Sequence, residues 1–282
     1  MADYHIKHTT RYTYGSTVMD CINQIMLYPV NDAQQIIKKH EIKITNNPIV
    51  ETFIDYFGNT IGVFSNINPH DALTIESDID VSVNVIAVAE DTIAAAEQWK
   101  ELEQVKETVS YMDFMHKEVF ESENKIREVL NEIVDYSKTP LINALILSEY
   151  VYENFEYKKG VTSVETRVDE ILKLKAGVCQ DFAHVLLVML RMIGIPGRYV
   201  SGYICPKNHE LRGEGATHAW VEAYIPFFGW LGLDPTNNCI VTDRHVRLAV
   251  GTNFTDCSPV KGTYKGSSEH TLEVSVSIDN GH

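Results

Sequence analysis

A single cysteine stands just before a nearly continuous apolar run, and this pattern constrains the fold more than any other in the chain. Cys179 follows Gly177, and apolar residues dominate from Phe182 to Ile193. The pattern predicts a loop that ends at a buried helix, with the thiol at the helix N-terminus. There, unpaired backbone N–H groups and the positive end of the helix dipole favour thiolate over thiol. The same string is equally compatible with a buried cysteine that acts as a small hydrophobic residue.

A β-hairpin is predicted downstream of this cysteine. Residues 216–224 alternate as a strand does, 225–229 form a turn signal, and 230–236 form a second short strand. The two strands carry His218 and Asp234. An imidazole can deprotonate a thiol and later protonate a leaving amine, and a carboxylate can fix the imidazole tautomer. A lone strand histidine is more often structural, but the three residue types together predict a Cys–His–Asp triad.

The loop length of this hairpin decides whether the two side chains share a face. With a symmetric four-residue loop, Asp234 would lie opposite Val221, on the face away from His218. A five-residue loop, or a bulge near Gly229, would instead place Asp234 opposite Trp220 and diagonal to His218. A triad requires the second arrangement, and we therefore predict it.

Motifs along nearly the whole chain resemble the transglutaminase-like cysteine peptidase superfamily. The matching stretches near the predicted triad are residues 177–183 (GVCQDFA), 191–203 (RMIGIPGRYVSGY), 218–222 (HAWVE) and 229–236 (GWLGLDPT). Residues 245–251 and 257–262 continue the resemblance, and residues 4–8, 27–29 and 55–59 look like the β-rich N-terminal region of bacterial members. The resemblance implies a papain-like active-site fold with Cys179, His218 and Asp234 as the triad. The superfamily includes proteases, amidases and crosslinking enzymes.

The chain changes character near residue 90, which predicts two domains of an α+β protein. Before this point, residues 4–14, 35–44, 50–55, 60–65 and 73–88 read as strands separated by Asn, Pro and Gly. We expect residues 1–90 to form an antiparallel β-sandwich. Residues 91–282 are expected to form the transglutaminase-like catalytic domain, with helices near 92–108, 122–135, 140–155 and 164–174 and a C-terminal strand region that includes 271–278. Its predicted core is the cysteine-bearing helix packed on an antiparallel sheet that carries His218 and Asp234.

Composition and charge restrict the classes of molecule that this protein is expected to bind. The net charge of −15 argues against nucleic acid and anionic membranes, because a phosphate-binding surface needs clustered Lys and Arg. No apolar run approaches the length that spans a bilayer, and the N-terminus lacks the apolar core of a signal peptide. The five scattered cysteines contain no Cys-x-x-Cys pair, which argues against a zinc site or a disulfide framework. We expect a cytoplasmic protein of undetermined oligomeric state, without metal or cofactor, whose partner is a peptide or protein substrate.

Several residues near the triad are candidates for the pocket. The backbone N–H of Cys179 should donate to an oxyanion, with Gln180 and Tyr157 as further candidate donors. Tyr157 is equally compatible with a packing role. Trp220 shares a strand face with His218 and either shields the triad or packs against it. Asp181, in the first helix turn, is expected to cap the helix. Four N-terminal histidines are expected to be structural or surface residues rather than metal ligands: His5, His8, His40 and His70.

These residues favour a cysteine hydrolase that cleaves peptide or amide bonds through a thioester intermediate. Transamidation by the same intermediate is an alternative, since the two outcomes differ only in whether water or an amine reaches the thioester. The chain shows no Asp-x-Asp-x-Asp calcium loop, which favours hydrolysis. A catalytically silent peptide-binding module that keeps the fold is the third alternative.

Overall fold

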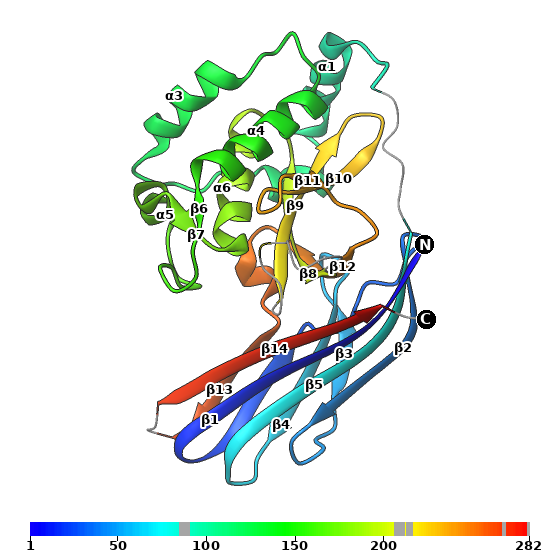
Figure 1. Ribbon diagram of the computed structural model, residues 1–282, viewed down its shortest axis with the longest axis vertical. Coiled ribbons are helices and arrows are strands. Elements are labelled where there is room, and N and C mark those ends of the chain that lie inside the picture. Colours follow the sequence, from blue (N-terminus) through cyan, green and yellow to red (C-terminus); the bar gives the residue numbers. More distant parts are fainter. Residues whose placement is uncertain (85–90, 206–211, 213–216, 267–268, 281–282) are drawn as a thin grey trace.

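The computed structural model describes residues 1–84, 91–205, 212, 217–266 and 269–280. It shows two parts: a layered arrangement of long strands, and a shorter sheet covered by helices (Figure 1). The domain boundary predicted near residue 90, and residues 85–88 of the last predicted N-terminal strand, lie outside the described residues. Within the described range, no helix is both long and apolar enough to span a bilayer.

The first part is built around one long strand that belongs to two layers. The N-terminal strands are β1 (Ala2–Ile25), β2 (Gln35–Ile44), β3 (Glu51–Ile54), β4 (Thr60–Asn66) and β5 (His70–Val83). The first half of β1 pairs with β5, and β5 pairs with β2. After an irregularity between Thr13 and Val18, the second half pairs with β4, which pairs with β3. One hydrophobic core contains residues from both layers, as expected for a sandwich.

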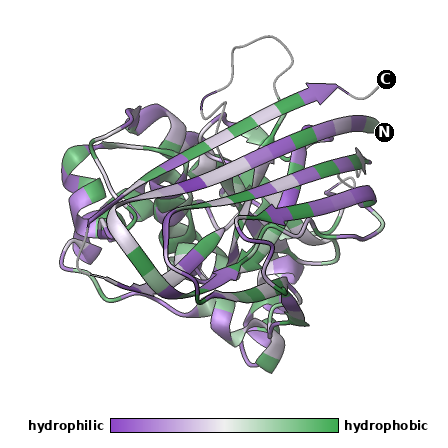
Figure 2. Cartoon of the chain, turned by 90° about the horizontal axis from the view of Figure 1, so that it is seen from below, coloured by the Kyte–Doolittle hydropathy of each residue, from purple (hydrophilic) through white to green (hydrophobic). Residues whose placement is uncertain are grey.

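Both ends of the chain contribute to this first part. The C-terminal strands β13 (Val260–Lys265) and β14 (His270–Asn280) each pair antiparallel with β1. The expected assignment of the C-terminal strand region to the catalytic domain therefore differs from the structure. The alternation of apolar and polar residues predicts a strand but not its partner, because pairing between distant segments leaves no local pattern. Seen from below, hydrophilic and hydrophobic residues alternate along these strands (Figure 2).

Helices cover one face of the second part. They are α1 (Ala95–Val105), α2 (Val109–Met112), η1 (Asp113–Met115), α3 (Glu123–Ile133), α4 (Pro140–Asn154), α5 (Val168–Leu174) and α6 (Cys179–Met192). The predicted helices are confirmed to within a few residues, apart from the short elements between α1 and α3. The start of α4 is fixed by Thr139, whose hydroxyl accepts the backbone N–H of Ile142, with proline at the first helical position.

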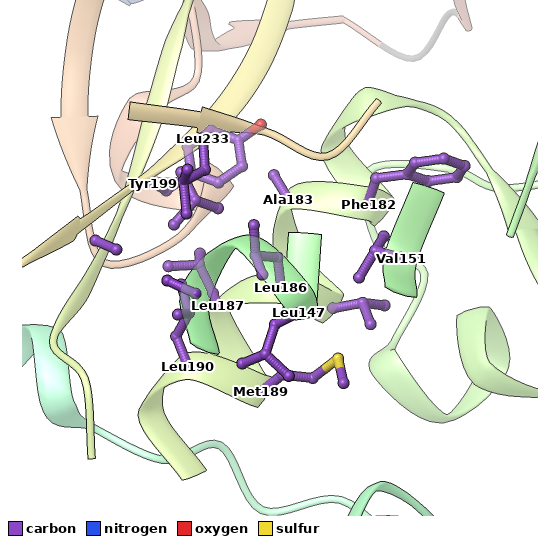
Figure 3. Packing of buried hydrophobic residues seen from close by; sticks show 14 of the residues in the cluster. Leu147, Val151, Phe182, Ala183, Leu186, Leu187, Met189, Leu190, Tyr199 and Leu233 are labelled. Carbon is purple, nitrogen blue, oxygen red and sulfur yellow. The ribbon is translucent and has the colours of Figure 1, made fainter. Parts of the chain in front are cut away.

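The sheet of the second part consists of β8 (Gly197–Ile204), β9 (His218–Ile225), β10 (Gly229–Asp234), β11 (Cys239–Ile240) and β12 (His245–Gly251), in the order β11-β10-β9-β8-β12. A short helix η2 (Phe254–Cys257) follows β12. Helix α6 packs on β8 and β9, and its leucines form a dense core with α4 (Figure 3). Burial of α6 on nearly all sides explains why its sequence is apolar almost throughout.

The other face of this sheet packs against the β layers. Tyr203, Val246 and Leu248 belong to the same core as the N-terminal strands. Asn59 links the two parts with two hydrogen bonds: its side-chain amide donates to the Val250 carbonyl, and its side-chain carbonyl accepts the Val250 N–H. The β layers thus support β12 and the sheet that carries the candidate site.

Candidate active site

The thiol of Cys179 lies at the first residue of α6, as the sequence predicts. Asp181 caps the helix start, since its carboxylate accepts the Val178 backbone N–H at 2.7 Å and the Thr162 hydroxyl at 2.6 Å. Gly177 permits this cap, because a Cβ at this position would approach the Asp181 carboxylate to 2.4 Å. The first backbone N–H groups of a helix have no intrahelical acceptor, so those beside Cys179 are available to an oxyanion.

The hairpin has the predicted parity. Gly229 pairs with Ile225, and Leu233 pairs with Val221, which places Asp234 level with Trp220. The loop itself contains three residues rather than five, and Gly229 adopts a positive φ of 101°. Three- and five-residue loops give the same parity, so both side chains fall on one face.

His218 and Asp234 form a fully buried hydrogen-bonded pair. The imidazole Nε2 lies 2.8 Å from the Asp234 carboxylate, and both side chains are 0% exposed. The other carboxylate oxygen accepts the backbone N–H of Thr236 at 2.9 Å. Because a carboxylate in this setting accepts hydrogen bonds, Nε2 of His218 carries the proton. The Nδ1 atom has no hydrogen-bond partner among the described residues, so it remains available for the thiol.

The pKa values of this pair move in opposite directions. Burial alone lowers the pKa of His218, but the charge and hydrogen bond of Asp234 raise it well above its usual range, with a smaller contribution from Cys179. Burial raises the pKa of Asp234, but His218 and then His245 hold it far below its usual range. The site therefore favours an imidazolium next to a carboxylate, which is the state that a thiolate partner requires.

A cavity of about 290 Å³ brings three of the candidate residues together with His218, while Asp234 lies behind the imidazole and does not line it. Cys179, Gln180, Tyr157 and His218 all line it. Tyr157 is held there by a two-residue strand, β6 (Glu156–Tyr157), which pairs in parallel with β7 (Ala176–Gly177) directly before the cysteine. Burial, followed by the nearby Cys179, raises the pKa of Tyr157 to about 12, so its hydroxyl stays protonated at neutral pH and can donate.

Trp220 lies elsewhere. It is 1% exposed and does not line the cavity that contains Cys179. Its ring packs edge-on against His245, with ring centroids 5.2 Å apart, and lies 6.3 Å from His218. Gly202 on the neighbouring strand allows this position, because a Cβ there would come within 2.6 Å of the indole ring. The structure thus places Trp220 beneath the pair as a packing residue rather than in the pocket.

Two polar residues that contact Asp234 were not predicted in this role. His245 Nε2 lies 3.3 Å from the carboxylate, and Asn237 donates its side-chain amide at 2.8 Å. Asn237 follows the Asp-Pro turn and is accessible to sequence reasoning, whereas His245 begins β12 and has no distinguishing spacing. The ligand atoms of His218, Asp234 and His245 lie within 4.8 Å of one another, a spacing that a metal ion can use. Each of these atoms already takes part in the hydrogen bonds above, so the cluster is explained without a metal.

Two further ionisable side chains near the site are engaged elsewhere. Glu222 forms ion pairs with Arg198 at 2.5 Å and with Arg247 at 3.2 Å. His184 lies 2.6 Å from Glu118. Neither side chain lines the cavity that contains Cys179.

Comparisons with known proteins agree with this architecture. Residues 127–235 match the transglutaminase-like superfamily, and residues 4–82 match the bacterial transglutaminase-like N-terminal region. The uncharacterized protein Rv2569c of Mycobacterium tuberculosis is 31% identical over 98% of this chain and 91% of its own length. A protein-glutamine gamma-glutamyltransferase of Pseudomonas aeruginosa is 35% identical over 100 residues, which are 33% of this chain and 15% of that protein.

The fold is also present in a solved structure. A Cytophaga hutchinsonii protein, provisionally described as a cysteine protease, superposes with a TM-score of 0.76 at 19% identity. The match covers 99% of this chain and 90% of that one. At this identity the likeness establishes the fold alone, including the packing of the β layers with the helix-covered sheet. Together with the sequence matches, it shows that the chain belongs to the transglutaminase-like superfamily, as a member with the bacterial transglutaminase-like N-terminal region.

Proposed function

We propose that the protein is a cysteine-dependent hydrolase that cleaves peptide or amide bonds through a thioester. One observation carries this proposal: a cysteine at a helix N-terminus lines the same cavity as a histidine that is buried against a carboxylate. A helix start and an adjacent imidazolium are two features that favour a thiolate near neutral pH. The superfamily to which the chain belongs supports the same reading.

The geometry supports a two-step cycle. The Cys179 thiol passes its proton to Nδ1 of His218, and the sulfur attacks the carbonyl carbon of the substrate. As the tetrahedral intermediate collapses, the C–N bond breaks and the leaving amine takes the proton from His218, which leaves a thioester. Water then attacks the thioester carbon with His218 as base, and the C–S bond breaks to regenerate the thiol. Asp234 holds the imidazole throughout and forms no covalent bond.

The oxyanion of each tetrahedral intermediate needs donors beside the sulfur. The backbone N–H of Cys179 and the Tyr157 hydroxyl are the donors that we assign, because both belong to segments that meet at the cavity. Gln180, which lines the same cavity, is the third candidate. Preorganised donors of this kind stabilise charge that develops only in the transition state.

A peptide or protein chain is the substrate class that the surface favours. A second hollow of about 580 Å³ shares Gln180, Tyr199 and Phe254 with the catalytic cavity, so the two form adjoining sections on one side of the thiol. Two hollows that share three lining residues offer an extended chain a continuous path beside the thiol. The net charge of −15 disfavours polyanionic substrates such as nucleic acid.

Thiol alkylation followed by peptide mapping tests the proposal. We expect iodoacetamide to label Cys179 near pH 7 much faster than Cys205, whose pKa is raised by burial. The His218→Ala variant should lose this preference, because the thiol then lacks its base. Labelling of Cys179 no faster than Cys205 would contradict catalysis and favour a silent peptide-binding module. Cleavage of a peptide library by the wild-type protein, absent in Cys179→Ala, would then define the bond that is attacked.

Transamidation is the second candidate, supported by the local similarity to a protein-glutamine gamma-glutamyltransferase. It uses the same thioester and replaces water with a primary amine. Incubation of a glutamine-containing peptide with a fluorescent primary amine distinguishes the two reactions. We expect hydrolysis to predominate at millimolar amine; quantitative incorporation of the amine would favour crosslinking instead.

A further inference from the structure

Asp234 receives hydrogen bonds from two imidazoles rather than one. His218 Nε2 lies 2.8 Å from the Asp234 Oδ2 atom, and His245 Nε2 lies 3.3 Å from the same oxygen. All three side chains are 0% exposed. The triad predicted from the sequence accounts for one of these histidines and leaves the other unexplained. A fully buried polar side chain normally forms hydrogen bonds, so the bond between His245 and Asp234 calls for an explanation.

The hydrogen bond at the far side of the His245 ring fixes its tautomer. The backbone N–H of Thr242 lies 3.3 Å from His245 Nδ1 and can only donate, so Nδ1 carries a lone pair. A neutral imidazole with an unprotonated Nδ1 carries its proton on Nε2. The ring therefore presents an N–H group to the Asp234 carboxylate. We propose that His245 is a positioning residue, which holds Asp234 in place through this Nε2–H donor so that Asp234 can orient His218.

The surroundings keep the two imidazoles in different protonation states. Burial lowers the pKa of His245, and the attraction of Asp234 only partly opposes this because His218 and Arg244 lower it further. The pKa of His218 moves upward instead. One carboxylate thus supports one histidine that becomes a cation and one that stays a neutral donor. A second imidazolium at Asp234 would compete with the first, and the Thr242 N–H disfavours it.

His245 reaches Asp234 from β12, which lies at the edge of the sheet away from β10 and β11. It is the first residue of β12 and pairs with Ile204 of β8, while Asp234 ends β10. The Trp220 ring, which lies over Gly202, packs against the edge of the imidazole. The position of the histidine is therefore set by the sheet and the indole, independently of its bond to Asp234.

The consequence for catalysis rests on the proposed function. When His218 accepts the Cys179 proton, its Nε2–H must remain aligned with Asp234. His245 and Asn237 occupy the directions in which the carboxylate could otherwise rotate. Loss of the His245 donor should weaken the imidazolium and slow the reaction of Cys179 most at the acid end of the pH range.

Two substitutions separate hydrogen bonding from packing. His245→Gln keeps an N–H group near the Nε2 position and loses the ring, whereas His245→Phe keeps the ring against Trp220 and loses the donor. We expect the acid limb of the iodoacetamide rate profile at Cys179 to stay near the wild-type position in His245→Gln. In His245→Phe it should move up by about one pH unit, which lowers the rate near pH 6 about tenfold. A wild-type profile in His245→Phe, or equal shifts in both variants, would overturn the proposal.

Two tyrosines that line the cavity with the thiol do not change charge over this range. Burial raises the pKa of Tyr157 to about 12 and that of Tyr199 well above its usual value. Alkylation also needs no substrate, so it tests the role of His245 whichever amide the protein cleaves. If wild-type Cys179 reacts no faster than Cys205, the proposed function fails, and the tautomer measurement below still decides the positioning role.

The wild-type protein offers a test that does not depend on any variant folding. In the full-length chain labelled with ¹⁵N-histidine, the side-chain signals of His245 can be assigned through contacts to the Trp220 indole protons. We expect a neutral ring, protonated on Nε2 and unprotonated on Nδ1, from pH 5 to pH 8. Protonation of Nδ1, in either a neutral or a charged ring, would overturn the proposal.

Discussion

Among the residues that the structure describes, two buried cysteine–histidine pairs occur, Cys21–His70 and Cys179–His218, and their surroundings differ. In the β layers, Cys21 Sγ lies 3.2 Å from His70 Nε2, and the other ring nitrogen lies 2.7 Å from the Asn68 carbonyl. Since a carbonyl can only accept, His70 is protonated on Nδ1 and its Nε2 accepts from the thiol. A histidine as base, with an oxygen that orients it, therefore occurs in both pairs.

The difference lies in charge and position. Cys21 sits in the middle of a strand and is 1% exposed, and burial raises its pKa. Its histidine is oriented by a neutral carbonyl, which stabilises an imidazolium less than a carboxylate does. Cys179 starts a helix, lines a cavity and faces a histidine whose pKa is raised by Asp234. A thiol and an imidazole are close together in both pairs, so a carboxylate, a helix N-terminus and access to a cavity are the features that distinguish the pair proposed to be reactive.

The largest expected effect comes from removing each thiol in turn. Cys179→Ala should lower the rate of peptide cleavage at least about 10,000-fold, because no other group can form the thioester. Cys21→Ala should leave the rate within about twofold, since the pair in the β layers lies apart from the cavity. Steady-state turnover of a cleaved library peptide measures both. Activity that survives Cys179→Ala would end the distinction between the two pairs.

Asp234→Asn tests whether the carboxylate makes the difference. The amide is nearly isosteric but cannot stabilise an imidazolium, and it can present an N–H group that favours the wrong tautomer of His218. We expect kcat to fall about 1,000-fold with little change in KM, by the logic of a catalytic triad. Circular dichroism should show an unchanged fold. Initial rates should be measured with a single peptide, because a competing peptide would lower the rates of wild type and variant alike. A kcat within tenfold of wild type would contradict the role of the charge.

The elements around the reactive pair were predictable to different degrees. The helix start at Cys179 and the presence of the hairpin follow from local signals, which are a glycine, an apolar run and a turn, whereas the hairpin parity is predicted from the requirement of a triad. His245 could not be identified in this way, because its contact with Asp234 arises only when β12 joins the far edge of the sheet. The Cys21–His70 pair, 49 residues apart in the chain, is likewise a product of strand pairing. Local patterns specify elements, whereas long-range register specifies which side chains meet.

The two pairs should also differ in how stability depends on pH. The pKa of His218 is raised in the folded protein. The stabilisation that His218 gives is therefore complete below its unfolded pKa of about 6.5, and it is lost as the pH rises through its folded pKa. The pKa of folded Asp234 is lowered, so its contribution is present above about 3.9 and is lost as pH falls through the folded value. Between these limits, Asp234→Asn should lower the free energy of unfolding by about 3 kcal/mol.

Urea titrations from pH 5 to pH 11 measure this difference. The gap between wild type and Asp234→Asn should be widest near pH 5–6 and narrow at alkaline pH. For Cys21→Ala the loss should be constant from pH 5 to pH 8, because the raised pKa of Cys21 keeps the thiol neutral throughout. If the difference in free energy of unfolding between wild type and Asp234→Asn did not change with pH, His218 and Asp234 would not form an ion pair.

The smallest expected effect concerns the tyrosine beside each thiol. Burial and then the nearby Cys21 raise the pKa of Tyr14, and Tyr157 lines the cavity with Cys179. Tyr157→Phe should lower kcat about tenfold and leave KM nearly unchanged, because the hydroxyl donates only to the oxyanion of the transition state. Tyr14→Phe is the matched control and should leave kcat unaltered. If Tyr157→Phe changed KM alone, the tyrosine would only line the cavity. The oxyanion donors would then be the backbone N–H groups at the start of α6. A cysteine within a strand, such as Cys21, has no such groups, because strand N–H groups are paired with the neighbouring strand.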